Sequence, residues 1–332
     1  MSQIKTEFKC ATLLKSVYFG PNIHPIKRQI FIAYLCLAGI CLIWGTTFLA
    51  IRIGVQGFPP FLFAAIRQIS AGLFLSAIVL ITQKPKLPDF RYFVEMAIMG
   101  FLMITLSNGL VSWAEVFVDS GIAAIICSLM PVLVILINLS IDRSELPNAT
   151  IIIGVIIGLV GIVIIFSEHL QNFTNPNYTI GILLIFIATV SWAVGSILVR
   201  KSNQNSNLVQ NAGVQMIFGG LWCLPLSFVF DDLTDIHWTS PTIYSLVYLS
   251  IFGSALAYVL YYYAISKLPM TIVSLYSYVN PLVAVALGTL ILDEKLNLKI
   301  GLAFIVTVAG IYLVNRGYLL ARKKSELEKT IV

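Results

Sequence analysis

Long apolar runs dominate this sequence and constrain its fold more than any other feature. Ten of them, bounded by charged residues, Pro or Gly, cover residues 30–51, 61–82, 92–114, 120–140, 149–167, 179–199, 208–230, 241–264, 271–291 and 298–315. A helix needs roughly 20 mostly apolar residues to cross a bilayer. The runs are far longer than the strand of about ten residues of a membrane barrel, and they do not alternate. The sequence therefore predicts an all-α polytopic membrane protein with ten transmembrane helices.

The composition excludes the main classes of water-soluble protein. Of the 332 residues, 58% are hydrophobic and 11% are charged, whereas soluble domains carry roughly 25% charged residues. A soluble enzyme, a nucleic-acid-binding protein and a disordered chain are all incompatible with these values. No spacing of Cys or His is typical of a metal site, so we expect no cofactor.

The distribution of Lys and Arg predicts the orientation in the membrane. If the N-terminus is cytoplasmic, 17 of the 21 basic residues lie in cytoplasmic segments, three lie outside, and Arg67 lies within a span. Basic residues accumulate in cytoplasmic loops. We therefore expect the protein to lie in the cytoplasmic (inner) membrane with both termini in the cytoplasm. Residues 1–29 and 316–332 would then be cytoplasmic tails, the second one basic, and residues 168–178 an external linker.

The two halves of the chain resemble each other. A shift of 148 residues places Trp44 on Trp192, a shift of 150 places Asn108 on Tyr258, and a shift of 149 places Glu145 on Glu294. Each unit, 30–167 and 179–315, holds five predicted spans. Because five is odd, the second unit would enter the membrane upside down, which is the inverted repeat of many secondary transporters.

Several of these residues resemble the EamA family of the drug/metabolite transporter superfamily. They are the Trp-Gly-x-x-Phe sequence of residues 44–48, Arg67 in the second span, Pro131 and Pro281 in the fourth and ninth, and the Glu residues that follow those spans, Glu145 and Glu294. The resemblance covers about residues 30–316. It implies two inverted five-helix repeats, a central cavity and alternating access.

Polar stripes indicate which helix faces line such a cavity. Asn108, Ser112 and Glu115 recur at helical spacing in the third span, and Tyr258 and Tyr262 form the matching stripe in the eighth. Polar groups within a membrane face partners or water. The stripes thus mark either a solute pathway or hydrogen bonds that hold helices together.

Two prolines at mid-depth, Pro131 and Pro281, are candidate hinges, because proline removes a helix hydrogen bond and frees a carbonyl. Ser128, Tyr278 and Asn280 lie beside them in the sequence. Together with the freed carbonyls they could bind a polar solute. A kink without a functional role is the equal alternative.

Arg67 is the most unusual residue, because it lies about two turns inside the second span, and Gln215 is its counterpart in the other half. Its guanidinium could bind a carboxylate or phosphate of a solute. Alternatively, it could pair with Glu115 and lock two helices together. Trp44 and Trp192 lie near the centres of their spans, which suggests cavity walls or core packing.

These features predict a secondary transporter, with export as the expected direction, for small polar or amphipathic organic metabolites. The resemblance suggests amino acids or toxic compounds. A carrier of nucleotide-sugars or lipid-linked sugars is the alternative solute class, and a membrane-embedded enzyme is the alternative from another class. The expected partners are a small-molecule solute and the lipid bilayer, and we expect no nucleic acid. The sequence does not decide whether the chain forms a homodimer.

Overall fold

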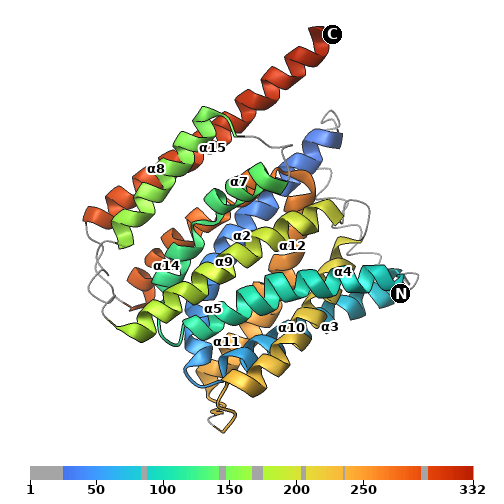
Figure 1. Ribbon diagram of the computed structural model, residues 1–332, viewed down its shortest axis with the longest axis vertical. Coiled ribbons are helices and arrows are strands. Elements are labelled where there is room, and N and C mark those ends of the chain that lie inside the picture. Colours follow the sequence, from blue (N-terminus) through green and yellow to red (C-terminus); the bar gives the residue numbers. More distant parts are fainter. Residues whose placement is uncertain are drawn as a thin grey trace, which may run out of the picture.

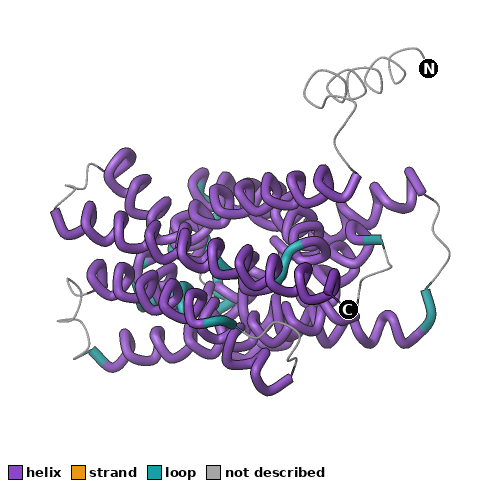
Figure 2. The backbone as a smooth tube through the Cα atoms, turned by 90° about the horizontal axis from the view of Figure 1, so that it is seen from above, coloured by secondary structure: helices purple, strands orange, loops and turns teal. Residues whose placement is uncertain are grey.

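The computed structural model describes residues 25–83, 88–141, 147–166, 175–202, 207–234, 236–292 and 298–331, and within these ranges it contains helices and short connections but no strand. Figure 2 shows the helices side by side in several layers. Glu145 and Glu294, and most of the expected linker 168–178, lie outside the described residues.

Six helical segments are long and apolar enough to cross a membrane. Four are single helices, α2 (Pro25–Val55), α3 (Pro60–Gln83), α9 (Pro176–Ser202) and α10 (Leu208–Phe230). The third predicted span is continuous through α4 (Phe90–Gly100), the π-helix η1 (Phe101–Gly109) and α5 (Leu110–Ala114). The eighth runs likewise through α11 (Ser240–Tyr248), the π-helix η4 (Leu249–Leu256) and α12 (Ala257–Lys267). The prediction of a helical membrane protein is confirmed.

The other predicted spans are shorter or interrupted. The fourth breaks into α6 (Ser120–Cys127) and α7 (Met130–Ile141), and the ninth into α13 (Met270–Val273) and α14 (Tyr276–Leu292). The fifth and tenth are α8 (Ala149–Phe166) and α15 (Leu298–Ile331). Helix α15 continues past the expected span end at residue 315 as far as Ile331.

Helices α8 and α15 form a close pair at one side of the bundle (Figure 1). Glycines make this approach possible, because a Cβ atom on Gly310 would lie 2.6 Å from the carbonyl oxygen of Gly154. Small residues allow helix backbones to approach closely in membranes. Helix α2 packs chiefly against α12 and α14.

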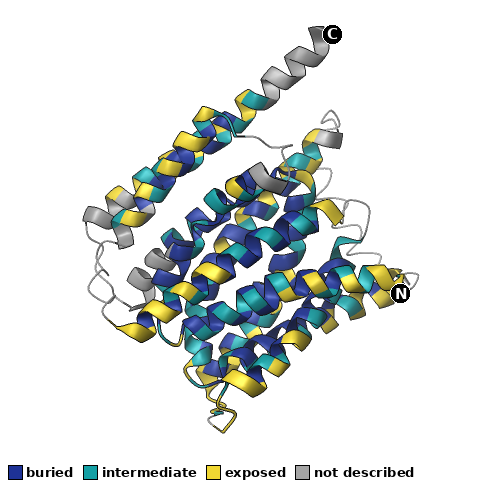
Figure 3. Cartoon of the chain, in the orientation of Figure 1, coloured by how far each residue is buried: buried dark blue, intermediate teal, exposed yellow. Residues whose placement is uncertain are grey.

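Burial separates an inner face from an outer face on most helices (Figure 3). Large apolar side chains remain exposed on the outside, among them Leu42, Ile81 and Phe228. In water such a surface would be unfavourable, but lipid acyl chains solvate it. The exposed belt therefore follows from the same apolar runs that predict the spans.

The contacts at the two ends of the bundle give the helix directions. At one end, the backbone N–H groups of Phe61 and Leu62 donate to the Asp231 carboxylate at 3.3 and 2.8 Å. Helix α9 packs near Val118 where it begins, and near Glu95 where it ends, since Ser202 Oγ donates to the Glu95 carboxylate at 2.5 Å. Helix α2 ends beside Val118. Helices α2 and α9 therefore run in opposite directions.

Candidate solute pocket

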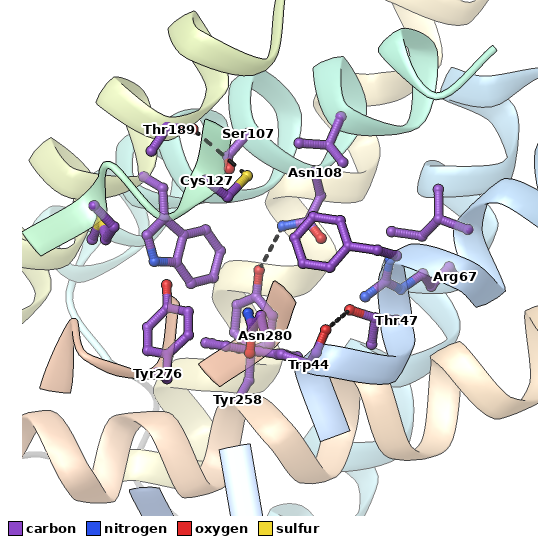
Figure 4. A pocket seen from close by; sticks show the side chains of 15 residues that line it. Trp44, Thr47, Arg67, Ser107, Asn108, Cys127, Thr189, Tyr258, Tyr276 and Asn280 are labelled. Atoms are coloured by element: carbon purple, nitrogen blue, oxygen red, sulfur yellow. Dashed lines mark hydrogen bonds between the residues drawn. The ribbon is translucent and has the colours of Figure 1, made fainter. Parts of the chain in front are cut away.

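A pocket with a cavity volume of about 80 Å³ lies between the two halves of the chain. Its walls come from α2, α3, η1 and α5 in the first half and from α9, α12 and α14 in the second, with the α6–α7 segment closing one side (Figure 4). Among the described residues that line it, Arg67 alone carries a charge.

Residues related by the sequence repeat meet at this pocket. The rings of Trp44 and Trp192 lie edge to face, with 5.3 Å between their centroids. Asn108 donates from Nδ2 to the Tyr258 hydroxyl at 3.1 Å, and Figure 4 shows both side chains directed into the same space. Tyr276 adds another aromatic wall, with its ring centroid 4.9 Å from that of Trp44. The pocket is thus aromatic with a few polar groups.

The π-helical segments position the polar side chains. In a π-helix the backbone hydrogen bonds shift from i+4 to i+5, so carbonyl groups become available to side chains. The Gly253 carbonyl, within η4, accepts from Trp44 Nε1 at 3.1 Å and from Arg67 Nη2 at 3.3 Å. Arg67 Nε also donates to Ser254 Oγ at 2.8 Å. One irregular turn therefore orients both the indole of Trp44 and the guanidinium of Arg67.

Arg67 is almost completely buried, with 2% of its surface exposed. Within the described part of the chain, its Nη1 has no hydrogen-bond partner, and neither does either carboxylate oxygen of Glu115. The ion pair between Arg67 and Glu115, one of the two alternatives raised by the sequence, is therefore not formed. Arg52 and Arg67 both act electrostatically on Glu115, and Arg52 also donates to the Glu115 backbone carbonyl. The spacing of Arg67 and Glu115 in the sequence gives neither the rotation of their helices nor the direction of their side chains, so it could not decide whether they pair.

Some of the other residues that the sequence suggested for the cavity line the pocket, and others lie outside it. Asn280 lines the pocket together with Trp44, Trp192, Arg67, Asn108 and Tyr258. The hydroxyl of Ser112 donates to Asn108 O of its own helix at 2.8 Å. The remaining candidates lie outside the lining and are Glu115, Ser128, Gln215, Tyr262 and Tyr278.

Several of these outer candidates hold helices together. The Tyr262 hydroxyl donates to Gln215 Oε1, and Gln215 Nε2 donates to Met99 O at 3.3 Å. The Tyr278 hydroxyl donates to Val155 O at 3.1 Å and so joins α14 to α8. For these residues the structure places the polar group between helices and not in the pocket.

The two candidate hinge prolines occupy different positions. Pro131 is the second residue of α7, directly after the interruption at residues 128–129. Pro281 lies inside α14, several residues past the interruption at residues 274–275. The chain breaks near both prolines, but only Pro131 adjoins its break.

Sequence reasoning missed five polar or aromatic lining residues, which are Thr47, Ser107, Cys127, Thr189 and Tyr276. Thr189 donates to Cys127 Sγ at 3.6 Å across the pocket wall. Isolated Thr, Ser and Cys are common in apolar helices and gave no periodic signal. Thr47 was detectable, because it follows Trp44 by one helical turn.

The fold and the pocket define a multi-pass helical membrane protein with a central aromatic pocket between two related halves. The chain belongs to the EamA-like transporter family, whose model matches residues 31–167 and again 179–316. Such a transporter acts on a small-molecule solute within a lipid bilayer.

Relatives of similar length have been found in bacteria. The "Uncharacterized inner membrane transporter YedA" of Escherichia coli (strain K12) is 32% identical over 87% of this chain and 92% of its own length. The "Uncharacterized transporter YoaV" of Bacillus subtilis (strain 168) is 24% identical over 84% of this chain and 95% of its own. A solved crystal structure matches the fold with a TM-score of 0.71 at 18% identity, over 88% of this chain and 98% of its own.

Proposed function

We propose that this chain is a secondary transporter that carries a small polar or amphipathic organic solute through the central pocket by alternating access. The observation that supports this most directly is the contact between repeat-related residues, Trp44 with Trp192 and Asn108 with Tyr258, around one pocket. Secondary transporters with inverted repeats bind their solutes near the midplane, between the repeats.

The proposal includes ten transmembrane helices arranged as two inverted repeats, 30–167 and 179–315. Two arginine contacts support it. Arg52 donates to Val118 O at 3.2 Å, and Arg200 donates to Leu268 O, also at 3.2 Å. The shift of 148 residues relates the two arginines, and the shift of 150 relates the two carbonyls. We call them the end contacts, because they lie at opposite ends of the bundle.

The end contacts also suggest how access could alternate. Each one joins the last turn of a repeat's first span to the end of its third span, where carbonyl groups carry partial negative charge and attract a cation. Arg52 is reinforced by Asp119, whose carboxylate lies 3.6 Å from its Nη2. Opening of the pocket to one side would require the end contact on that side to break.

We further propose that the protein lies in the cytoplasmic (inner) membrane with both termini in the cytoplasm and that it exports its solute. The printed name of YedA places that relative in the inner membrane. Amino acids and toxic compounds are the proposed solutes. Nucleotide-sugars or lipid-linked sugars form the alternative class, and a membrane-embedded enzyme is the alternative function.

The test is a flux assay in liposomes that contain the purified chain. The liposomes are loaded with a mixture of amino acids and nucleotide-sugars, and the released solutes are identified by mass spectrometry. We expect release of a subset of solutes above protein-free liposomes, and its loss in Asn108→Leu, which removes the polar contact to Tyr258. Liposomes that release nothing while their lipid is chemically altered would favour the enzyme instead.

A further inference from the structure

The carboxyl group of Glu115 is a buried acid that lies outside the pocket lining. It follows the last residue of α5, at the end of the bundle proposed to be external, and none of its surface is exposed. Within the described part of the chain, neither of its oxygens has a hydrogen-bond partner. Burial without a donor favours the neutral, protonated form of a carboxyl group. This conformation therefore accommodates a protonated Glu115 better than a carboxylate.

The surroundings of Glu115 contain few other ionisable groups. Helix α5 packs chiefly against α9, η1, α3 and α2, and neither η1 nor the rest of α5 carries an ionisable side chain. The ionisable groups around Glu115 are Arg52 of α2, Arg67 of α3, Asp119 and Cys127 of the segment that follows α5, and Tyr178 of α9.

Neither arginine gives a hydrogen bond to the Glu115 carboxyl group. Arg67 donates to groups of η4. Arg52 donates to the backbone carbonyls of Glu115 and Val118, and its Nη2 lies 3.6 Å from the Asp119 carboxylate. The side chain of Arg52 is 29% exposed, so it lies on the water side of Glu115. When Arg52 leaves these carbonyls, both water and a free guanidinium become accessible to an ionised Glu115.

At the opposite end of the bundle, an apolar residue occupies the position equivalent to Glu115. The shift of 150 residues that relates the third and eighth spans places Glu115 on Ile265. Ile265 is buried, one helical turn before the Leu268 carbonyl that accepts from Arg200. The two end contacts therefore share an arginine and a carbonyl, and they differ in the buried acid that accompanies the contact of Arg52.

We propose that Glu115 is a proton-binding switch that controls opening of the pocket at the external end. Protonated Glu115 keeps the contact of Arg52 closed, and ionisation of Glu115 favours its opening. The closed state then binds one proton more than the open state, so a lower external pH favours closure. In alternating access, closure of one side precedes opening of the other, so external protons favour the return of the carrier to the cytoplasmic side. This role in the cycle rests on the proposed function and orientation.

Opening can be measured without transport, which separates failure of this inference from failure of the proposed function. The purified chain in detergent retains Trp44 and Trp192, which line the pocket. The tryptophans replaced by Phe are Trp113, Trp222 and Trp238. Acrylamide is a neutral quencher that reports access of the pocket indoles to water. We expect quenching to rise about two- to fivefold between about pH 5 and about pH 8, as Glu115 ionises.

Three substitutions assign this pH dependence. Glu115→Gln keeps the shape of the protonated acid and cannot ionise, so its quenching should stay at the wild-type acid value at both pH values. Arg52→Gln removes the external end contact and should give the high value at both. Glu95→Gln makes the same chemical change as Glu115→Gln at the other end of the third span, and it should keep the wild-type pH dependence.

Infrared difference spectra show the protonation state of Glu115 directly. At about pH 6, most exposed carboxyl groups are ionised. The wild type should then show the carbonyl band of a protonated carboxyl group that the Glu115→Gln protein lacks. This band should disappear on further increase of the pH, over the same range in which quenching rises.

Four outcomes would overturn the inference. Two concern the wild type, which are quenching that does not change with pH and an infrared spectrum identical to that of Glu115→Gln at about pH 6. The others are a Glu115→Gln protein or an Arg52→Gln protein that keeps the wild-type pH dependence. A preparation that moves solute in liposomes and shows one of these outcomes would retain the proposed function and lose the proton switch.

Discussion

The carboxylate of Glu115 is buried at the end of the third span, and neither of its oxygens has a hydrogen-bond partner in the described part of the chain. Glu115 contributes to the fold through its backbone carbonyl, which accepts a hydrogen bond from the Arg52 guanidinium. A carboxylate without a partner costs free energy when it is buried. The side chain of Glu115 is therefore not a stabilising lock in this conformation.

We predict that Glu115→Gln leaves the thermal unfolding temperature of the purified protein unchanged or raises it, because no ion pair is lost and a charge is removed. Asp231→Ala is the control at a half-buried carboxylate. That carboxylate accepts the first N–H groups of α3, so its removal should cost about 1 kcal/mol. If Glu115→Gln lowered the unfolding temperature as much as Asp231→Ala, the ion pair with Arg67 would have to form in the membrane.

At the scale of elements, the irregular parts of the helices lie where the pocket is. The π-helices η1 and η4 belong to the third and eighth spans, which the repeat relates to each other. Ser107 and Asn108 in η1 line the pocket, and Gly253 in η4 holds Trp44 and Arg67. The interruption at residues 128–129 adjoins the lining residues Cys127 and Met130. Regular α-helices at these places would not present the same carbonyl groups.

The end contacts give a prediction about which side of the pocket opens. In a variant that retains Cys127 as its single cysteine, Arg52→Gln should raise labelling of Cys127 by a membrane-impermeant maleimide from outside the cell. Arg200→Gln should raise labelling from the cytoplasmic side. A rise of about ten- to hundredfold corresponds to the loss of one charge-assisted hydrogen bond. Labelling that rises from the same side in both variants would contradict a pair of alternating end contacts.

At the scale of the whole molecule, the connections of both halves meet at common ends. The N–H of His237 donates to Gly57 O at 2.9 Å, so the connection after α10 lies beside the connection after α2. Tyr92 donates to Asn211 Oδ1 at 3.0 Å, and Asn207 Nδ2 lies 2.5 Å from Gln83 Oε1, so the other end joins α4, α3 and α10. The orientation of this bundle in the membrane is the one we propose from the distribution of Lys and Arg.

We predict that cysteines introduced at Asn175 and Asp232 react with an impermeant thiol reagent that is added to intact cells. Both residues are exposed and lie at the end proposed to be external. A cysteine at Lys84 should react only after the cells are permeabilised. The background should lack the five native cysteines. Labelling of the Lys84 position in intact cells, without labelling at Asp232, would show that the orientation is inverted.

Much of the fold could be predicted because hydrophobic length and periodicity are local properties. The six long spans, the related halves and the helix order follow from apolar runs and from shifts of 148 to 150 residues between matching residues. The sequence repeat relates Asn108 to Tyr258, and the structure joins these two residues by a hydrogen bond that the sequence did not predict. The burial of Arg67 also follows from its depth within an apolar run.

Only the tertiary structure decided which polar groups meet. Arg67 turned to the π-helix η4 and not to Glu115, because helix rotation and backbone irregularity determine which donors and acceptors are within 3 Å. Gln215 and Tyr262 are hydrogen-bonded to each other and lie outside the pocket. Cys127 and Thr189, which the sequence did not indicate, are hydrogen-bonded to each other and line it. A sequence determines which residues avoid lipid, but the hydrogen-bond geometry between helices depends on all of their positions at once.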